Sequence, residues 1–448
     1  MFHKRKHVKR KNSITFQVII GSFLVMILLG TMLLMLPVSS RCGKITSFPD
    51  ALFTAVSATC VTGLVVKDTA TYWSPFGQAV IITLIQIGGM GVITIGVAVM
   101  TASGRKIGLW QRSMMQESIS APKVGGIVRF TSFILKAALI IELTGAVLFL
   151  PVFCKDFGIL KGIWYSIFHS ISAFCNAGFD LMGGRGGKFS SLTSYSNNVY
   201  LNVIVMTLII LGGIGFLVWS DVITNKHHFR RYSLQSKVVI TTSLILIFLP
   251  AIYLFFCEYK GEKLVDRATY SMFQSVTTRT AGFNTTDLTK ISESGIGIMI
   301  VLMLIGGSPG STAGGMKTAT FAVLFLSAIT VFMRRNDVQV FKRRVSEEAV
   351  RSAGAVFFMY LFLFFSSGII ISRTENLPLW TCLFETSSAV GTVGITLGIT
   401  SKLSLLSRAI LIVLMFFGRV GGLTLIYAAL PSADSTNSRM PLEKISVG

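Results

Sequence analysis

Long apolar runs alternate with short polar segments along most of the chain. Residues 14–36 carry no charged side chain, and this run is long enough to cross a bilayer as one helix. The basic residues before it resemble the start of a signal peptide, but the run is too long for one and Pro37 follows without a cleavage site. We therefore expect a retained first span. Seven further apolar runs bring the expected number of spans to eight: residues 76–100, 131–153, 198–220, 238–257, 295–333, 352–372 and 405–430.

Four shorter segments lie between these spans, near residues 49–60, 161–174, 266–278 and 378–390. Each has about 12–14 residues, too few to cross a bilayer, which is typical of a re-entrant helix. The chain then divides into four units of span, short segment and span. Their expected bounds are 14–100, 131–220, 238–333 and 352–430, with re-entrant pore loops at 49–64, 161–179, 266–284 and 378–396. A basic N-terminus (1–13), three linkers (101–130, 221–237 and 334–351) and a tail (431–448) account for the rest.

The four short segments share one pattern: a Phe, then a Ser or Thr, then a tetrapeptide that ends in glycine. The third copy is one residue shorter between its Phe and its glycine. The four tetrapeptides are Cys60, Val61, Thr62 and Gly63; Cys175, Asn176, Ala177 and Gly178; Arg279, Thr280, Ala281 and Gly282; and Gly391, Thr392, Val393 and Gly394. A glycine cluster follows in each second span, at residues 88–91, 212–215, 306–310 and 418–422. Two landmarks that recur together predict four fused repeats of one orientation, related about an axis along the membrane normal.

Four glycine-ended loops around one axis can line a narrow pore. Glycine lets the backbone approach the axis and permits a positive φ, so that carbonyl oxygens can replace the water shell of a cation. The short helix before each loop directs its partly negative C-terminal end toward the ion. We therefore expect the four tetrapeptides to form a selectivity filter. The alternative is that glycines only allow close helix packing; for the clusters at 88–91 and 212–215 both roles stay open.

Composition supports a polytopic membrane protein. Apolar residues make up 52% of the chain, charged residues 13%, and the mean hydropathy is +0.69. A soluble globule, a disordered chain and a secreted disulfide scaffold are therefore excluded. The six cysteines contain no CxxC pair, which indicates free thiols rather than a zinc site.

Membrane topology accounts for the net charge of +22. With the N-terminus inside, the cytoplasmic segments hold 23 Lys and Arg against 7 Asp and Glu. The outer segments hold 15 and 11 when Arg408, at the outer end of the last span, is counted with them. This asymmetry follows the positive-inside rule and predicts a multi-pass protein of the plasma membrane with both termini in the cytoplasm. The basic runs are short and lack interleaved aromatic residues, so no nucleic acid partner is expected.

The family signal lies in the tetrapeptides and two further motifs. The segments TCVTGL, FCNAGF, TRTAGFN and GTVGIT, the run IGGSPGSTAGGMK and the motif FFGRVG resemble the Trk/Ktr/HKT superfamily of potassium transporters, most closely the bacterial Ktr-type membrane subunit. The resemblance covers about residues 14–430. It implies an all-α polytopic membrane protein with eight transmembrane helices and four re-entrant pore helices in a pseudo-fourfold arrangement round one pore. It also implies that glycine in the first loop goes with potassium and serine with sodium, so Gly63 favours K⁺. Because no loop reproduces TVGYG, we expect looser discrimination against Na⁺ than in a potassium channel.

The second span of the third repeat is interrupted by ten residues that cannot continue a helix, since five are glycine and one is proline. These are Gly306, Gly307, Ser308, Pro309, Gly310, Ser311, Thr312, Ala313, Gly314 and Gly315. The resemblance implies an intramembrane gate here, and the alternative is a simple kink. A nucleotide-binding loop is disfavoured, because Met316 separates the last glycine from Lys317.

Of the charged residues within the predicted spans, Arg419 and Glu142 invite a functional role. Arg419 takes the place of Gly89, Gly213 and Gly307 in the other repeats. It would either repel cations in the pore or bond to the carbonyls of residues 306–315. Glu142 would pair with a cation or with the helix ends of another repeat.

Neither an enzyme nor an organic-solute carrier is favoured. His169, the only histidine at a short segment, is expected to be a packing residue, and no catalytic set converges in the spans. A broken-helix carrier of organic solutes fits less well, because the repeats are parallel and end in glycine loops. A Na⁺-permeable monovalent cation channel of the same fold stays open as an alternative to K⁺ uptake.

The resemblance also implies partners. It predicts a homodimer docked on a cytosolic ring of RCK-type subunits, an octamer, which would hold the nucleotide (ATP/ADP or an NAD-type molecule). This chain itself is expected to hold no cofactor, with K⁺ as the permeant ion and Na⁺ as an activator. The basic linkers 101–130, 221–237 and 334–351 would contact the ring or, alternatively, lipid headgroups.

Overall fold

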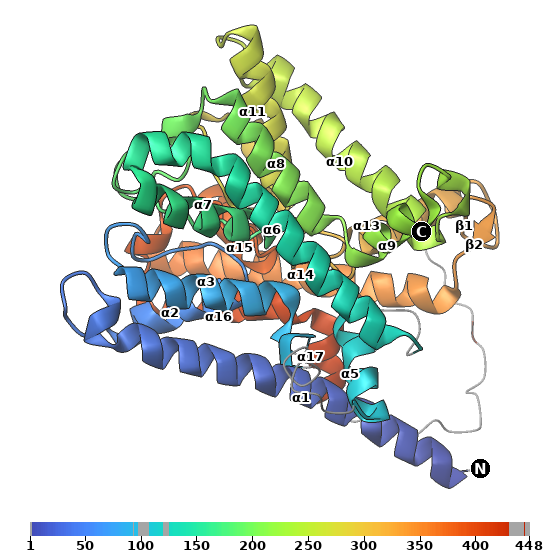
Figure 1. The fold of residues 1–448 in the computed structure, drawn as a ribbon. Helices are drawn as coiled ribbons and strands as arrows, with labels where there is room; N and C mark the ends of the chain where they lie inside the picture. Colours follow the sequence, from blue (N-terminus) through green and yellow to red (C-terminus); the bar gives the residue numbers. More distant parts are fainter. Residues whose placement is uncertain (1, 93, 97–106, 120–124, 430–442, 444–448) are drawn as a thin grey trace.

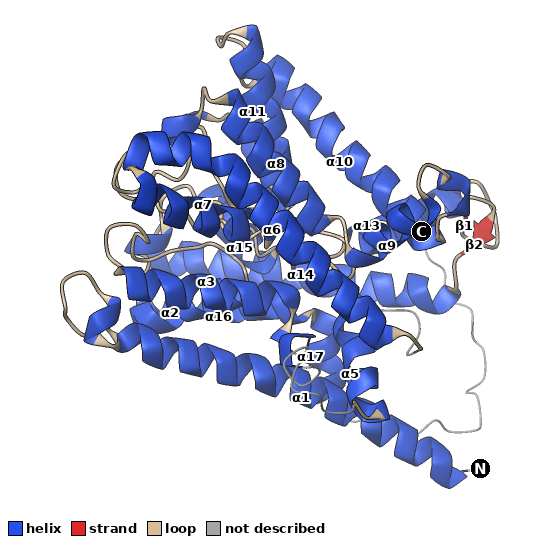
Figure 2. Ribbon diagram, in the orientation of Figure 1, coloured by secondary structure: helices blue, strands red, loops and turns tan. Residues whose placement is uncertain are grey.

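The computed structural model describes residues 2–92, 94–96, 107–119, 125–429 and 443 (Figure 1). The regular secondary structure of this part of the chain is helical except for one short hairpin, β1 (Gln339–Val340) with β2 (Arg343–Arg344), which stands out in Figure 2. The predicted linker 101–130 is described only in part, and the predicted tail 431–448 lies outside the described residues except for one position.

Four long helices open the four repeats. They are α1 (Phe2–Met35), α6 (Ile127–Phe157), α10 (Leu234–Cys257) and α14 (Glu347–Glu375). In the described part of the chain these four are long and apolar enough to cross a membrane. Their outward faces carry exposed large apolar side chains such as Leu249 and Phe358, as lipid contact requires. The expected basic N-terminus is not a separate segment, because α1 begins at Phe2 and runs through it without a break.

A short helix packs against each long one. These helices are α2 (Phe48–Thr59), α7 (Ile159–Phe174), α11 (Leu264–Thr277) and α15 (Leu379–Val390), and they pack on α1, α6, α10 and α14 respectively. Their ends lie within two residues of the predicted short segments. The Phe of the repeated pattern is fully buried in each, as Phe53, Phe168, Phe273 and Phe384. This shared anchor explains why four different sequences place their short helices alike.

The second helix of each repeat is α3 (Pro75–Met90), α8 (Val199–Gly213), α12 (Glu293–Leu304) or α16 (Leu405–Val420). The prediction of continuous spans is wrong at 198–220 and 405–430, whereas the predicted interruption within 295–333 is present. A sharp bend of 95° separates α8 from α9 (Phe216–Asn225), Gly421 separates α16 from α17 (Gly422–Ala429), and residues 305–317 separate α12 from α13 (Thr318–Phe332). The helix α3 likewise ends before Gly91.

Backbone conformation explains three of these helix ends. Gly91, Gly215 and Gly421 have φ values of 87°, 100° and 89°, which a right-handed helix cannot accommodate. The glycine clusters therefore end helices instead of lying within them. The described part of the chain also contains α5 (Leu109–Ile119) and five 3₁₀ turns: Pro37–Ser39, Thr193–Tyr195, Phe229–Arg231, Leu288–Lys290 and Thr400–Lys402.

The four repeats close into a ring. Each second helix packs against the short helix of the next repeat, in the pairs α3 with α7, α8 with α11, α12 with α15 and α16 with α2. The last pair joins the two ends of the chain, and Figure 1 shows α16 (red) beside α2 and α3 (blue). A linear sequence of four repeats thus becomes a cyclic arrangement with a common centre.

Glycine permits the close approach of second and short helices within a repeat. A methyl group on Gly88 would overlap the carbonyl oxygen of Thr59, and one on Gly212 would overlap that of Phe174. Gly418 faces the carbonyl of Val390 in the same way. Of the two roles left open for the clusters at 88–91 and 212–215, close packing is therefore real at Gly88 and Gly212.

We expect Gly212→Ala to destabilise the protein by about 1–3 kcal/mol, because an overpacked contact with backbone has no flexible partner to move aside. Gly354→Ala is the matched control: Gly354 lies in α14 with open space around it, so alanine should stabilise its helix by up to about 1 kcal/mol. Thermal unfolding of the two purified variants measures the difference, and equal melting temperatures would contradict the packing role.

Candidate functional site

The four tetrapeptides, residues 60–63, 175–178, 279–282 and 391–394, form what we call the glycine loops. They share one backbone path. Each has a positive φ two residues before the glycine, at Val61, Asn176, Thr280 and Thr392 (56°, 59°, 74° and 52°), and again at the glycine (91°, 66°, 84° and 92°). The residue between them does not. Such alternation turns successive carbonyl groups toward the same side, and non-glycine residues with positive φ are strained positions that cluster at functional sites.

The structure brings all four glycines together in a closed cycle. A methyl group on Gly63 would overlap the carbonyl oxygen of Ala177 in the second loop, and one on Gly178 would lie 2.7 Å from that of Ala281 in the third. Gly282 stands in the same relation to Val393, and Gly394 to Thr62. No side chain fits at these four positions, so four backbones meet at the centre of the ring.

Hydroxyl groups of the short helices hold the loops in place. The Ser or Thr of the repeated pattern is buried as Ser57, Ser172, Thr277 and Ser388. Gly63 N–H donates to Ser57 Oγ (3.1 Å), and Gly394 N–H donates to Ser388 Oγ (3.0 Å). In the other two repeats the hydroxyl instead donates to the carbonyl after the glycine: Ser172 Oγ to Phe179 (2.7 Å) and Thr277 Oγ1 to Phe283 (2.6 Å). The repeated pattern includes these hydroxyls, but the pattern alone does not predict these hydrogen bonds.

A polar residue follows each buried Phe. In the second and fourth repeats this residue forms hydrogen bonds with the segment that follows the glycine loop. His169 accepts a hydrogen bond from Leu181 N–H at Nε2 (3.3 Å) and packs against the ring of Phe153. Its packing role is confirmed. Glu385 takes the corresponding place in the fourth repeat, where it is fully buried and accepts hydrogen bonds from the hydroxyls of Thr396 and Thr400.

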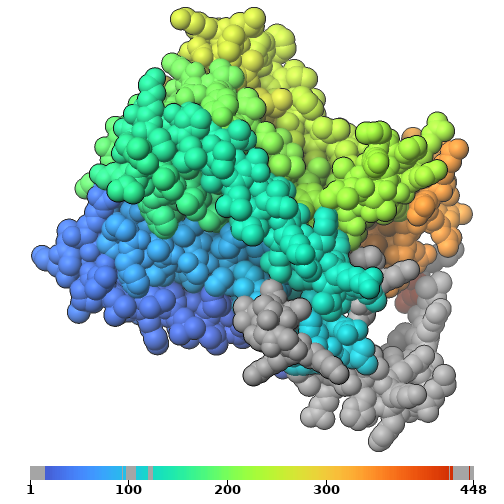
Figure 3. All heavy atoms as spheres, in the orientation of Figure 1, coloured from blue at the N-terminus to red at the C-terminus, as the bar shows by residue number. Residues whose placement is uncertain are grey.

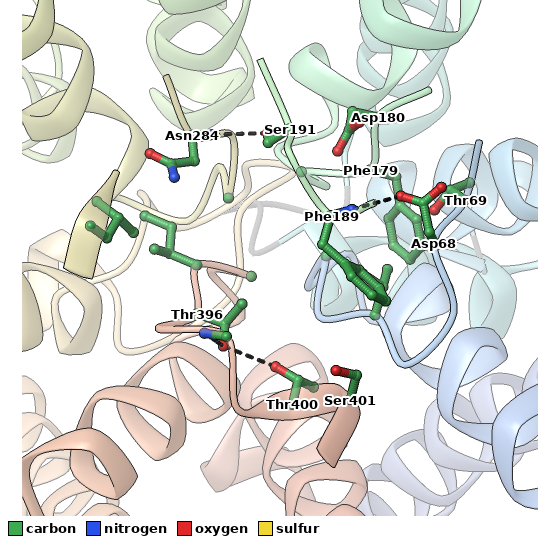
Figure 4. A pocket seen from close by; sticks show the side chains of 18 residues that line it. Asp68, Thr69, Phe179, Asp180, Phe189, Ser191, Asn284, Thr396, Thr400 and Ser401 are labelled. Carbon is green, nitrogen blue, oxygen red and sulfur yellow. Dashed lines mark hydrogen bonds between the residues drawn. The ribbon is translucent and has the colours of Figure 1, made fainter. Parts of the chain in front are cut away.

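A cavity of about 120 Å³, which we call the vestibule, opens on the C-terminal side of the glycine loops (Figure 4). All four glycines line it. Around them lie the residues two positions further on in each repeat: Val65, Asp180, Asn284 and Thr396. The vestibule is therefore symmetric in backbone but carries a charge at only one of these four positions.

Two carboxylates face the vestibule from neighbouring repeats. Asp68 is buried and accepts hydrogen bonds from Phe189 N–H (2.9 Å) and Thr71 N–H (2.8 Å), which ties the first repeat to the second. Asp180 accepts one from Met182 N–H (2.8 Å). Burial raises the pKa of Asp180 to about 7; the Met182 bond lowers it in part, and the nearby charge of Asp68 raises it. Asp180 therefore changes charge near neutral pH.

The segment 305–317 lies against the opposite, N-terminal side of the glycine loops. Gly314 abuts the side chain of Thr392, and Gly315 lies against the backbone of Gly391. Backbone hydrogen bonds tie this segment to the second and fourth repeats: Ser308 N–H to Gly213 (3.0 Å), Phe216 N–H to Gly310 (2.7 Å) and Gly315 N–H to Gly418 (3.0 Å). All ten residues predicted as a gate are in this segment, which is held by its neighbours and not merely kinked.

Arg419 links three parts of the ring. Its guanidinium donates to the carbonyl of Thr312 in segment 305–317, and to the carbonyls of Gly88 and Gly89 (2.8 Å to Gly89) at the end of α3. Of its two expected roles, bonding to the segment is confirmed. The same geometry ties the fourth repeat to the first.

Glu142 is buried in α6 and has a neutral partner. Gln86 of α3 donates from Nε2 to both carboxylate oxygens (3.0 and 3.1 Å), and the Cys175 thiol lies 4.0 Å from one of them. No ion pair involving Glu142 occurs within the described ranges. Of the two expected partners, the cation is therefore wrong. The contact is with the Gln86 amide of another repeat, four residues before the end of α3.

Comparison with known proteins places this ring in a family. Residues 1–438 match the model of the TrkH family, described as cation transport protein. The chain is a member of the TrkH family. The potassium/sodium uptake protein NtpJ of Enterococcus hirae is 39% identical over 99% of both chains, and the Ktr system potassium uptake protein B of Bacillus subtilis is 38% identical over 96% of both.

A solved structure agrees in fold. The potassium transporter TrkH of Vibrio parahaemolyticus superposes with a TM-score of 0.71 at 19% identity, covering 92% of this chain and 85% of its own. This TrkH family member is accordingly a multi-pass membrane transport protein and not an enzyme.

The charge of Asp180 leads to a pH prediction. A carboxylate in the vestibule attracts cations when ionised, and with a pKa of about 7 it is mostly charged at pH 8 and mostly neutral at pH 6. Lowering the pH on the vestibule side over this interval should therefore reduce initial cation uptake. Asp180→Asn should flatten this profile at the low-pH rate, whereas Glu262→Gln, at an exposed carboxylate away from the vestibule, should leave it unchanged. Uptake of ⁸⁶Rb⁺ into proteoliposomes tests this; an unaltered profile in Asp180→Asn would contradict it.

Proposed function

We propose that the protein is the ion-translocating membrane subunit of a potassium uptake system, and that K⁺ passes between the four glycine loops into the cell. The closed cycle of Gly63, Gly178, Gly282 and Gly394 carries this proposal. A dehydrated cation needs several oxygen ligands at once, and four backbones that meet at one axis can supply them. The relatives named as potassium uptake proteins support the choice of ion.

Electrostatics supports cation passage from both ends of the loops. The four short helices end at the loops, so the partial negative charge of each C-terminus lies next to the proposed path. On the other side, Asp68 and Asp180 in the vestibule favour cations over anions. We take the vestibule side as extracellular, which makes the N- and C-termini cytoplasmic in agreement with the positive-inside count.

Eight crossings follow if each broken second helix and the segment after it together complete one span. The bend of 95° between α8 and α9 interrupts the helical hydrogen bonds. Backbone groups left unpaired at such a break need other partners within the membrane. Phe216 N–H, just beyond the bend, finds such a partner in Gly310. The short helices α2, α7, α11 and α15 then enter and leave on one side as re-entrant elements.

We propose that segment 305–317, including Gly306–Gly315, acts as the gate, with Arg419 as its anchor. The segment lies directly against the fourth glycine loop, and its hydrogen bonds reach two other repeats. Movement of any of these helices would therefore move the segment. Arg419 adds a positive charge on this side of the loops, which would limit cation flux as well as hold the segment.

The names of the relatives support two further proposals, a dependence of uptake on Na⁺ and regulation by a separate subunit. NtpJ is named a potassium/sodium uptake protein, which supports a dependence on Na⁺, and the Ktr system name supports a separate regulatory subunit. We propose a homodimer of this chain on a cytosolic RCK-type ring that binds the nucleotide. The protein would thus respond to nucleotide without binding it.

Gly63→Ser tests the proposed filter. Gly63 has a φ of 91° and no room for a side chain, so serine must displace the second loop and widen or distort the site. We expect the K⁺ to Na⁺ permeability ratio to fall about tenfold, equivalent to about 1.4 kcal/mol of lost discrimination. Gly43→Ser is the matched control, because Gly43 also has a positive φ but open space around it. Unchanged selectivity in flux assays would refute the filter, and a native protein that already passes Na⁺ as well as K⁺ would favour the non-selective cation channel.

Deletion within 308–314 tests the proposed gate. If the segment occludes the path, its shortening should raise the uptake rate severalfold, because a barrier is removed while the glycine loops persist. Arg419→Gln should act in the same direction but more weakly, since the hydrogen bonds of the backbone in segment 305–317 remain. Uptake per mole of properly inserted protein is the measurement. Loss of uptake with normal insertion would assign the segment a structural role instead.

A further inference from the structure

A buried cation lies between the second and third repeats, and no residue that the structure describes gives it a charged partner. The side chain of Arg279, in the third glycine loop, is only 9% exposed. Its Nη2 donates one long hydrogen bond to Ser243 Oγ (3.3 Å), and its buried Nε has no partner. A guanidinium has five N–H donors, so most of its hydrogen-bonding capacity here is unused.

The free side of this guanidinium faces a small crevice. The crevice has a volume of about 30 Å³ and is bordered by α8, α10 and the end of α11. Its walls are mostly aliphatic, with Ile209, Ile214 and Ile247 among them, and Gly307 of segment 305–317 closes one side. None of the described residues that line it is acidic. A buried charge in such a place is costly unless something neutralises it.

The repeat pattern shows that this cation is not needed for the loop itself. Cys60, Cys175 and Gly391 hold the corresponding position in the other repeats, three residues before the glycine. All three are small and uncharged, yet their loops follow the same path as the third. The guanidinium is therefore an addition to one repeat, and its side chain is what lines the crevice.

We propose that the crevice is a binding site for a small inorganic anion, chloride under cellular conditions, which pairs with Arg279. A volume of about 30 Å³ is enough for a halide or for one or two water molecules, and it is too small to enclose phosphate, sulfate or an organic acid. A halide suits the site better than water does, because it neutralises the guanidinium and tolerates aliphatic walls. Its acceptor capacity is also not directional, so it can take the unpaired N–H groups together.

Such an anion would act on the transport that we propose above. Arg279 is three residues from Gly282, so its charge lies close to the cation path. Unpaired, it opposes a cation in the loops; paired with a halide, it does not. Removing the halide should therefore lower cation occupancy and uptake by about three- to tenfold, the size expected for one charge at close range in a partly polar medium.

Bromide gives a direct test of the site that does not depend on transport. Crystals of the full-length protein in sodium bromide should show an anomalous peak beside Arg279, and this peak should persist in Arg279→Lys, which keeps the positive charge. It should be absent in Arg279→Gln. No peak in the native protein, or an equal peak in Arg279→Gln, overturns the proposal.

Uptake of ⁸⁶Rb⁺ into proteoliposomes tests the consequence. Replacing chloride with gluconate, which is too large for the crevice, should slow the native protein about three- to tenfold, and bromide should restore the rate. In Arg279→Gln the uptake rate should no longer depend on the anion. In Lys44→Gln, at an exposed lysine distant in sequence from Arg279, the rate should depend on the anion as in the native protein. Equal native rates in chloride and gluconate overturn the coupling. If Arg279→Gln does not fold, the native protein and Arg279→Lys decide both tests. Absence of uptake in every condition would contradict the proposed function, and the bromide peak would still show whether the anion site exists.

Discussion

The meeting of four backbones at one axis is the constraint on which the rest of the structure depends. Gly63, Gly178, Gly282 and Gly394 each lie against the backbone of the next loop, where any side chain would collide. That closeness requires a strained, alternating backbone, and strain persists only where surrounding structure holds it. The buried Phe and the hydroxyl one helical turn later supply this support in all four repeats.

Close packing around the axis has a second consequence on the far side of the loops. The second helices approach the short helices tightly at Gly88, Gly212 and Gly418. Three residues further on in each repeat, Gly91, Gly215 and Gly421 take a positive φ at the helix end. Backbone groups freed at these ends bond to segment 305–317 and to Arg419. The gate that we propose is thus built from the polar groups that the broken helices leave unpaired.

Local patterns predicted the short helices and the glycine loops well, because each depends on residues close together in sequence. The buried Phe, the hydroxyl and the glycine fall within about three helical turns, so their repetition was visible without a structure. The break at 306–315 was predicted from its glycines and proline, but the breaks at Gly91, Gly215 and Gly421 were missed, since an apolar run looks continuous whether or not glycine takes a positive φ within it. Contacts such as Gln86 with Glu142 or Phe189 with Asp68 join repeats far apart in sequence, and no local signal announces them.

The departures from fourfold symmetry carry the chemistry that the repeat itself does not. The backbone path is common to all four loops, but a carboxylate lines the vestibule beside only one glycine, at Asp180, and a guanidinium precedes only one, at Arg279. Arg419 likewise replaces glycine in one repeat. A fully symmetric ring would discriminate between alkali cations only by the size of the ion and the number of oxygen ligands that the ring offers. Single charges placed around that ring give the protein means to respond to proton and anion concentrations, and each can be altered without rebuilding the four loops that meet at the centre.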